Sequence, residues 1–196
     1  MYSSLDELIS ARGSKPGFFF IQIGANDGVT DDVIRPYILK YGWSGILVEP
    51  LADVYEKLKK NYRHQKGLTF INAAVTPEAG VVEFWRHPEL PQCSGLGVRT
   101  RLQHRASMEK VLVRGVTMSS VMESRIGDVD LVQIDTEGFD DQVITGIPFE
   151  RCRPRALRWE HKHLKMGLRQ ELEKKLGGLG YGFIWEAHDT VAYLKE

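Results

Sequence analysis

The stretch Phe18-Phe19-Phe20-Ile21-Gln22-Ile23-Gly24-Ala25-Asn26-Asp27-Gly28 decides how the rest of the chain is interpreted. Its first six residues form an apolar run that is too short for a typical helix and rich in aromatic and β-branched side chains, as in a strand buried on both faces. A glycine turn follows, and Thr30-Asp31-Asp32 has the acidic composition of a first helical turn, although Pro36 also allows the helix to start at Arg35 or Pro36. The three parts predict a βα unit. Its turn lets a ligand approach the backbone, and its helix N-terminus offers amide donors to an anionic group.

A second apolar run, Gly45-Ile46-Leu47-Val48, ends at Glu49 and Pro50. An acid at the tip of the second strand of such a sheet accepts hydrogen bonds from ribose hydroxyls. Together with the glycine turn, Glu49 predicts a nucleoside-containing ligand that also carries an anionic group. The opposing interpretation of Glu49 is an exposed acid before a turn.

The glycine turn itself leaves two interpretations open. Gly24 and Gly28 are four residues apart, so the turn is not the Gly-x-Gly-x-x-Gly of dinucleotide-binding proteins. Asn26 and Asp27 either orient the ligand through their side chains or form a turn that tolerates left-handed backbone geometry. Agreement with the flanking strand and with Glu49 favours the ligand.

Four motifs in the chain occur in the order of one known family. They are Ile21-Gln22-Ile23-Gly24-Ala25-Asn26-Asp27-Gly28, Leu47-Val48-Glu49-Pro50, Val129-Asp130-Leu131-Val132-Gln133-Ile134-Asp135-Thr136-Glu137-Gly138-Phe139 and Leu157-Arg158-Trp159-Glu160-His161-Lys162-His163. They resemble the FkbM family of S-adenosylmethionine-dependent methyltransferases from about Phe18 to the C-terminus. The resemblance implies S-adenosyl-L-methionine as cofactor and S-adenosyl-L-homocysteine as product. Members are mostly O-methyltransferases that act on sugars, glycolipids or polyketides.

The rest of the chain predicts an α/β fold with a Rossmann-like, mostly parallel sheet. Further strands are expected at residues 68–75, 81–85, 111–116, 129–135 and 155–160, the last nearer an edge because it carries more charge. Residues 181–185 and 191–194 pair as a final antiparallel hairpin. Five βα units that end in such a hairpin outline the seven-stranded class I methyltransferase sheet. A nicotinamide-binding domain would continue with parallel strands.

Length predicts that residues 1–196 form a single domain. Residues 1–17 are expected to form an N-terminal helix, capped by Ser4-Leu5-Asp6-Glu7, and a linker. Residues 87–110 have no clear periodicity and include Arg99, Arg101, His104 and Arg105. Such a long connection is either a lid over the substrate or a surface loop.

Composition limits the partners. The 26 lysines and arginines balance the 26 acidic residues, so no overall field attracts nucleic acid. A small-molecule or glycan acceptor fits this balance better, and no membrane span is visible. Two cysteines without metal or redox spacing favour a reducing, cytoplasmic location. The oligomeric state is left open, and a homo-oligomer is compatible with the sequence.

The predicted cofactor neighbours lie at strand ends, where open α/β sheets bind ligands. The resemblance adds Asn72 and Ala73, beside the adenine, to the residues of the glycine turn and of the second strand's tip; the alternative for these two is strand-end packing. The full prediction is Gly24, Ala25, Asn26, Asp27, Gly28, Glu49, Pro50, Asn72 and Ala73.

Methyl transfer to a sugar hydroxyl requires a base, because the hydroxyl is a poor nucleophile. His161 is the best single candidate since an imidazole titrates near neutral pH. Its opposing interpretation is a surface histidine, and the other candidates are Asp135, Glu137 and Glu160.

Metal coordination is the alternative to acid–base chemistry at these residues. The acids, with His161 or His163, could gather round a divalent ion; oxygen ligands suit Mg²⁺, whereas histidine does not. We predict no metal site, because the acids lie on separate elements and only the fold could bring them together.

Three functions compete at this point. The first is an S-adenosylmethionine-dependent O-methyltransferase that acts on a hydroxyl of a sugar, glycan or glycosylated natural product. The second is an NAD-type oxidoreductase, against which the missing third glycine argues. The third is a binding module that holds S-adenosylmethionine without turnover.

Overall fold

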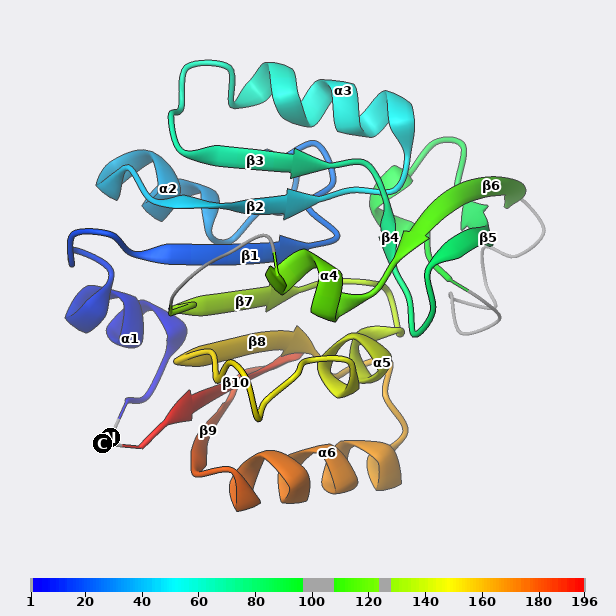
Figure 1. Ribbon diagram of the computed structural model, residues 1–196. Coiled ribbons are helices and arrows are strands. Elements are labelled where there is room, and N and C mark those ends of the chain that lie inside the picture. Colours follow the sequence, from blue (N-terminus) through cyan, green and yellow to red (C-terminus); the bar gives the residue numbers. More distant parts are fainter. Residues whose placement is uncertain (1, 97–107, 124–127, 196) are drawn as a thin grey trace.

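The computed structural model describes residues 2–96, 108–123 and 128–195, which form a seven-stranded sheet with helices on both faces (Figure 1). The strand order is β3-β2-β1-β7-β8-β10-β9, and β10 runs in the direction opposite to the other six strands of this sheet. The strands are β1 (Phe19–Ile23), β2 (Ser44–Val48), β3 (Leu68–Ile71), β7 (Leu131–Ile134), β8 (Ala156–Glu160), β9 (Tyr181–Trp185) and β10 (Asp189–Leu194). This architecture confirms the predicted fold class.

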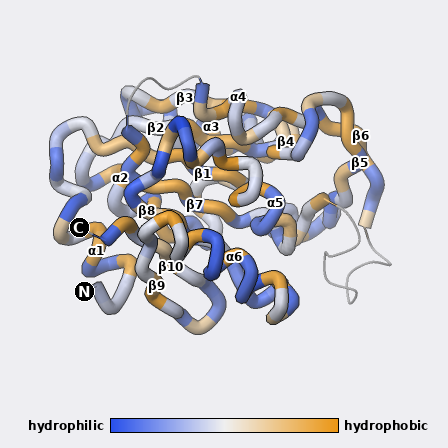
Figure 2. Tube along the Cα trace, turned by 60° about the horizontal axis from the view of Figure 1, so that its bottom comes forward, coloured by the Kyte–Doolittle hydropathy of each residue, from blue (hydrophilic) through white to orange (hydrophobic). Residues whose placement is uncertain are grey.

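Two hydrophobic clusters fix the helical layers. Alternate residues of β1 point to opposite faces, so Ile21 and Ile23 pack with α4 (Met118–Glu123), α5 (Asp140–Thr145) and α6 (Met166–Gly178). Phe18 and Phe20 pack on the other face with α1 (Leu5–Arg12), α2 (Arg35–Tyr41) and α3 (Ala52–Asn61). Figure 2 shows the hydrophobic residues concentrated in the central strands and hydrophilic residues along α6.

A second, three-stranded sheet of order β4-β6-β5 lies beyond the carboxyl ends of the parallel strands (Figure 1). It consists of β4 (Ala74–Val75), β5 (Gly80–Arg86) and β6 (Glu109–Val116). The short helix η1 (Pro91–Cys93) lies between β5 and β6 in the chain. The strand predicted at 68–75 is therefore wrong as a single unit. The Asn72 side chain donates to the carbonyls of Glu49 and Pro50, and the chain passes to the second sheet there.

The sequence left open whether the helix after the glycine turn starts at Asp31 or at Arg35 or Pro36. The helix begins at Arg35, one of the two later starts that Pro36 indicated, because proline fits only the first turn of a helix. The amides of Ile34 and Arg35 donate to the Asp32 carboxylate, so this helix start is already capped by protein.

The strand at 155–160 was expected nearer an edge, but β8 lies in the interior between β7 and β10. Its charge is tolerated there because Arg158 pairs with Asp189 at 2.8 Å and with Glu186 at 3.7 Å, both from the hairpin.

Some predictions fall outside the described residues. Arg99, Arg101, His104 and Arg105 of the predicted lid or loop are among them. Within the part of the chain that the structure describes, no helix combines the length and apolar character required to cross a bilayer.

Candidate active site

A cavity of about 470 Å³ opens at the carboxyl ends of the parallel strands, between the large sheet and the segment that follows β5. Its volume lies within the range of small-molecule sites, about 300–1,000 Å³. Residues from the ends of β1, β2, β7 and β8 all line it. The predicted gathering of strand ends at one site is therefore observed.

Gly24 lets β1 and β7 approach closely at the cavity floor. Its φ is +77°, and a Cβ placed there would lie 1.8 Å from the carbonyl oxygen of Asp135. The Gly24 and Ala25 amides both donate to the carbonyl of Val48, at 3.0 Å each. Only glycine can occupy this position without separating the two strands.

Of the other residues in the turn, Asn26 faces the cavity, whereas Asp27 and Gly28 make contacts within the protein. Asn26, in left-handed geometry at φ 48°, lines the cavity with Gly24 and Ala25. The Asp27 carboxylate instead accepts hydrogen bonds from the amides of Val29 and Thr30 and from the Thr30 hydroxyl. Gly28 packs against α3, where a Cβ would lie 2.5 Å from the Tyr62 ring. Asp27 and Gly28 are not among the cavity-lining residues, and these contacts shape the turn.

Glu49 joins the end of β2 to the turn. Its carboxylate accepts hydrogen bonds from the amides of Asn26 and Leu51, both at 2.9 Å, and only 6% of the residue is exposed. Burial raises the pKa of Glu49 to about 7, against the effect of the two amide donors, and nearby Asp53 and Asp27 add to the rise. Glu49 and Pro50 both line the cavity.

Glu49 is expected to make the native state less stable as pH rises from 4.5 to about 7. In this window the native Glu49 holds a proton that the unfolded chain has lost, so the native state binds more protons and raising the pH favours unfolding. The free energy of unfolding of the wild type, relative to Glu49→Gln, should fall between about pH 5 and about pH 8. Urea denaturation at both values measures it, and a constant difference would contradict the assignment.

Asn72 and Ala73 have different positions at the third strand's exit. Ala73 lines the cavity and is 1% exposed. Asn72 is not among the lining residues; its amide holds the carbonyls of Glu49 and Pro50 at 2.8 and 3.0 Å. Asn72 thus positions the segment that carries the Glu49 side chain.

The turn after β7 supplies acidic groups to the other end of the cavity. Asp135 and Glu137 line it, and Glu137 has a left-handed φ of 54°. Asp135 is exposed toward the cavity, while protein atoms surround its carboxyl closely and reduce its solvation. This desolvation, followed by the charges of Asp140 and Glu137, raises the pKa of Asp135 to about 7.

Asp140 was not foreseen, and it ties two strand exits together. One carboxylate oxygen accepts from the Thr136 hydroxyl at 2.9 Å and the Gly138 amide at 3.3 Å; the other accepts from the Glu160 amide at 3.2 Å. The side chain is fully buried, which raises the pKa of Asp140 to about 7. It therefore fixes the turn of Glu137 against the end of β8.

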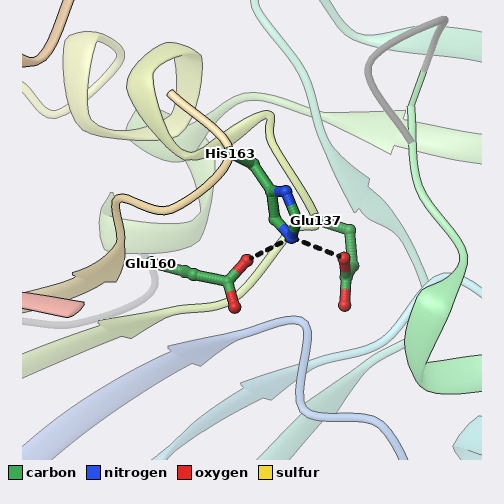
Figure 3. A group of neighbouring side chains, drawn as sticks. All are labelled: Glu137, Glu160 and His163. Atoms are coloured by element: carbon green, nitrogen blue, oxygen red, sulfur yellow. Dashed lines mark ion pairs between the residues drawn. The ribbon is translucent and has the colours of Figure 1, made fainter. Parts of the chain in front are cut away.

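The end of β8 brings Glu160 and His163 beside Glu137 (Figure 3). His163 Nε2 lies 3.0 Å from Glu160 Oε2 and 3.4 Å from Glu137 Oε2. The Lys162 ammonium contacts the other oxygen of Glu160. Glu160 and Lys162 line the cavity.

His161 is not brought into this group. It is absent from the cavity lining, and its Nδ1 lies 2.9 Å from the Thr190 hydroxyl. Burial and the charge of Arg169 lower the pKa of His161. Its role as base stays a prediction, and the cavity favours Asp135.

A polar row on the cavity side of the sheet was also missed. Gln22, Gln133 and Arg158 are paired neighbours on β1, β7 and β8, and all three line the cavity. The side-chain oxygens of Gln22 and Gln133 are buried and have no hydrogen-bond partner among the described residues. A polar residue in the middle of each apolar strand was the signal that could have revealed them.

The segment after β5 closes one side of the cavity. Residues 91–94 and 96, part of the predicted lid, line it. The Trp85 and Gly95 backbones exchange hydrogen bonds of 2.9 and 3.0 Å, and the His87 amide donates to Ser94 Oγ at 2.9 Å. These bonds hold the segment as a wall; whether it moves as a lid stays a prediction.

The strand order, the glycine turn and the acid at the second strand's tip define a class of protein. It is the class I methyltransferase fold, in which a nucleoside cofactor lies across the ends of the parallel strands.

Comparison with protein families shows which family of this class the chain belongs to. The Methyltransferase FkbM domain matches residues 22–195, so the chain belongs to the FkbM methyltransferase family, whose cofactor is S-adenosylmethionine. A comparison with curated protein sequences gives no significant match.

Solved structures agree on the fold. The methyltransferase FkbM from Methylobacillus flagellatus KT is similar with a TM-score of 0.57 at 12% identity, over 90% of this chain and 43% of that one. The METTL16 methyltransferase domain gives 0.54 at 12% identity, over 97% and 65%. A human methyltransferase 10 domain containing protein gives 0.50 at 13%, over 96% and 78%. The chain thus spans less than two thirds of the first two proteins.

Proposed function

We propose that this protein transfers the methyl group of S-adenosylmethionine to a hydroxyl of a sugar, glycan or glycosylated natural product. The observation that carries the proposal is the continuity of the cavity. It runs from Glu49 and the glycine turn, where a nucleoside would bind, to Asp135 and Glu160, where a proton can be accepted.

The cofactor end of the cavity matches the polar groups of S-adenosylmethionine. The Glu49 carboxylate is suited to accept hydrogen bonds from the two ribose hydroxyls. The buried side-chain oxygens of Gln22 and Gln133, which lack hydrogen-bond partners among the described residues, would accept from the ammonium of the methionyl part. When bound, the cofactor supplies an electrophilic methyl group on a sulfonium.

The acceptor end supports a hydroxyl substrate. Asp135, with a pKa raised to about 7, is half deprotonated near neutral pH and can take the hydroxyl proton as the oxygen attacks the methyl group. Among the described lining residues, the acidic side chains outnumber the basic ones, which are Arg158, Lys162 and His188. This balance disfavours a polyanion such as nucleic acid and supports a neutral glycan.

Two measurements test the proposal. Calorimetry should detect binding of S-adenosylmethionine and S-adenosylhomocysteine but not of NAD. Mass spectrometry of a sugar and glycoside library, incubated with cofactor that carries a labelled methyl group, should then find a labelled product. Binding of NAD alone would replace the proposal by an oxidoreductase, and cofactor binding without any labelled product would favour a binding module.

Glu49→Ala should weaken the binding of S-adenosylmethionine about 10- to 100-fold, since a hydrogen bond to a charged group contributes about 1.5–3 kcal/mol. Calorimetry at about pH 8, where the Glu49 carboxylate is ionised, measures the change. Glu78→Ala, an exposed acid outside the cavity lining, is the matched control. Equal affinity in Glu49→Ala and the wild type would show that the ribose binds elsewhere.

A further inference from the structure

The group of Glu137, Glu160 and His163 has the dimensions of a metal site (Figure 3). One ligand atom from each residue lies within 4.8 Å of the other two. Ligands about 2.1 Å from a metal, at tetrahedral or octahedral angles, lie about 3.0–3.5 Å apart. The distances from His163 Nε2 to the two carboxylates, 3.0 and 3.4 Å, agree with that spacing.

Hydrogen bonds within the protein position these three residues independently of a bound ion. The Asp140 carboxylate accepts hydrogen bonds both from the turn that carries Glu137 and from the backbone amide of Glu160, so it holds both segments in place. The amides of His161 and Lys162 both donate to the carbonyl of His188, which anchors the segment leading to His163. Ligand positions set by buried hydrogen bonds of this kind are typical of the residues that surround metal centres.

Glu160 gives an independent indication that a cation belongs here. Its side chain is 8% exposed, and Oε2, the oxygen that faces His163, is buried without a hydrogen-bond partner among the described residues. Lys162 reaches only the opposite oxygen, Oε1. The His163 ring, 3.0 Å from Oε2, is not aligned as a hydrogen-bond donor to it, and a buried carboxylate oxygen without an aligned donor is costly unless a positive charge is bound to it.

We propose that Glu137, Glu160 and His163 bind a first-row divalent cation, such as Mn²⁺ or Zn²⁺. One imidazole and two carboxylates suit these ions better than Mg²⁺, which prefers oxygen ligands alone. Three protein ligands leave a coordination position for another group, as catalytic metal sites do.

The role of the ion rests on the proposed function. Glu137 and Glu160 line the same cavity as Asp135, so the remaining coordination position is available to the acceptor hydroxyl. A divalent cation lowers the pKa of an oxygen bound to it and aligns that oxygen for reaction.

Titration with Mn²⁺ tests the site without any acceptor. The full chain is freed of metal with a chelator, and electron paramagnetic resonance follows the loss of the free Mn²⁺ signal. We expect one bound ion per chain and at least about tenfold weaker binding in His163→Ala and Glu137→Gln. His64→Ala, an exposed histidine after α3, should bind as the wild type does. Zn²⁺ should compete for the same site.

Calorimetry with S-adenosylmethionine on the same samples shows whether each variant is folded. If His163→Ala does not fold, Glu137→Gln, which keeps the size of the side chain, still tests the site. Mn²⁺ binding that is absent from the wild type, or equal in wild type and variants, would overturn the metal site. Cofactor binding retained in that case leaves the proposed function standing, which keeps the two failures distinct.

Discussion

Gly24→Ala is expected to prevent the chain from forming a stable native state. An alanine at φ +77° costs about 1–2 kcal/mol of backbone strain. The larger effect is steric, because the new Cβ would lie 1.8 Å from the Asp135 carbonyl oxygen, a backbone atom directly after β7, which pairs with β1. Separating these strands would break the hydrogen bond from the Asp135 amide to Ile23. The sum should exceed about 4 kcal/mol, a large part of a domain's stability.

Gly17→Ala is the matched control. Gly17 has φ +78°, but a Cβ there would meet nothing within 4 Å. It carries the backbone strain without the collision, so it should lose only about 1–2 kcal/mol. Urea denaturation of both purified variants, with soluble yield as a second measure, separates the two contributions. Equal stability of the two variants would show that the strands yield easily at Gly24.

Asp135→Asn should lower kcat by about 100- to 10,000-fold, the usual contribution of a general base. The amide keeps the size and polarity of the side chain, so the affinity for S-adenosylmethionine should change little. Only the deprotonated carboxyl accepts a proton, and the wild-type rate should therefore rise with pH through about 7. Single-turnover kinetics with the acceptor found by mass spectrometry, across about pH 6 to 8.5, measure both effects.

His161→Ala, in parallel, decides between the two candidate bases. A normal rate in Asp135→Asn, combined with a large loss in His161→Ala, would assign proton transfer to the histidine. Loss of cofactor affinity in Asp135→Asn would instead place Asp135 in the cofactor site.

The fold was readable from the sequence because each local pattern agreed with the others. The apolar run before Gly24 and the run before Glu49 both had the signature of strands buried on two faces, and the final hairpin set the order at the sheet's far edge. The failures came where tertiary contacts overrode the local pattern. Asn72 bends the chain through hydrogen bonds to a segment more than twenty residues away, which no periodicity can indicate.

The site was predictable only in part. Glu49 and Gly24 follow strands in sequence, so their positions at the cavity follow from the strands. His163 could not be chosen over His161, because the turn after β8 decides which imidazole meets Glu137 and Glu160. The importance of Asp140 depends on three hydrogen bonds to residues of two separate elements, and a sequence does not record them.

Two separate sets of hydrogen bonds support the strand exits that line the cavity. At the cofactor end, Asn72 after β3 holds the carbonyl of Glu49 after β2. At the other end, the Asp140 carboxylate holds the turn of Glu137 and the end of β8. The wall of residues 91–94 and 96 comes from the segment after β5 rather than from these strand exits, so substitutions there should leave both sets of hydrogen bonds in place. A library confined to that wall is the natural starting point for engineering.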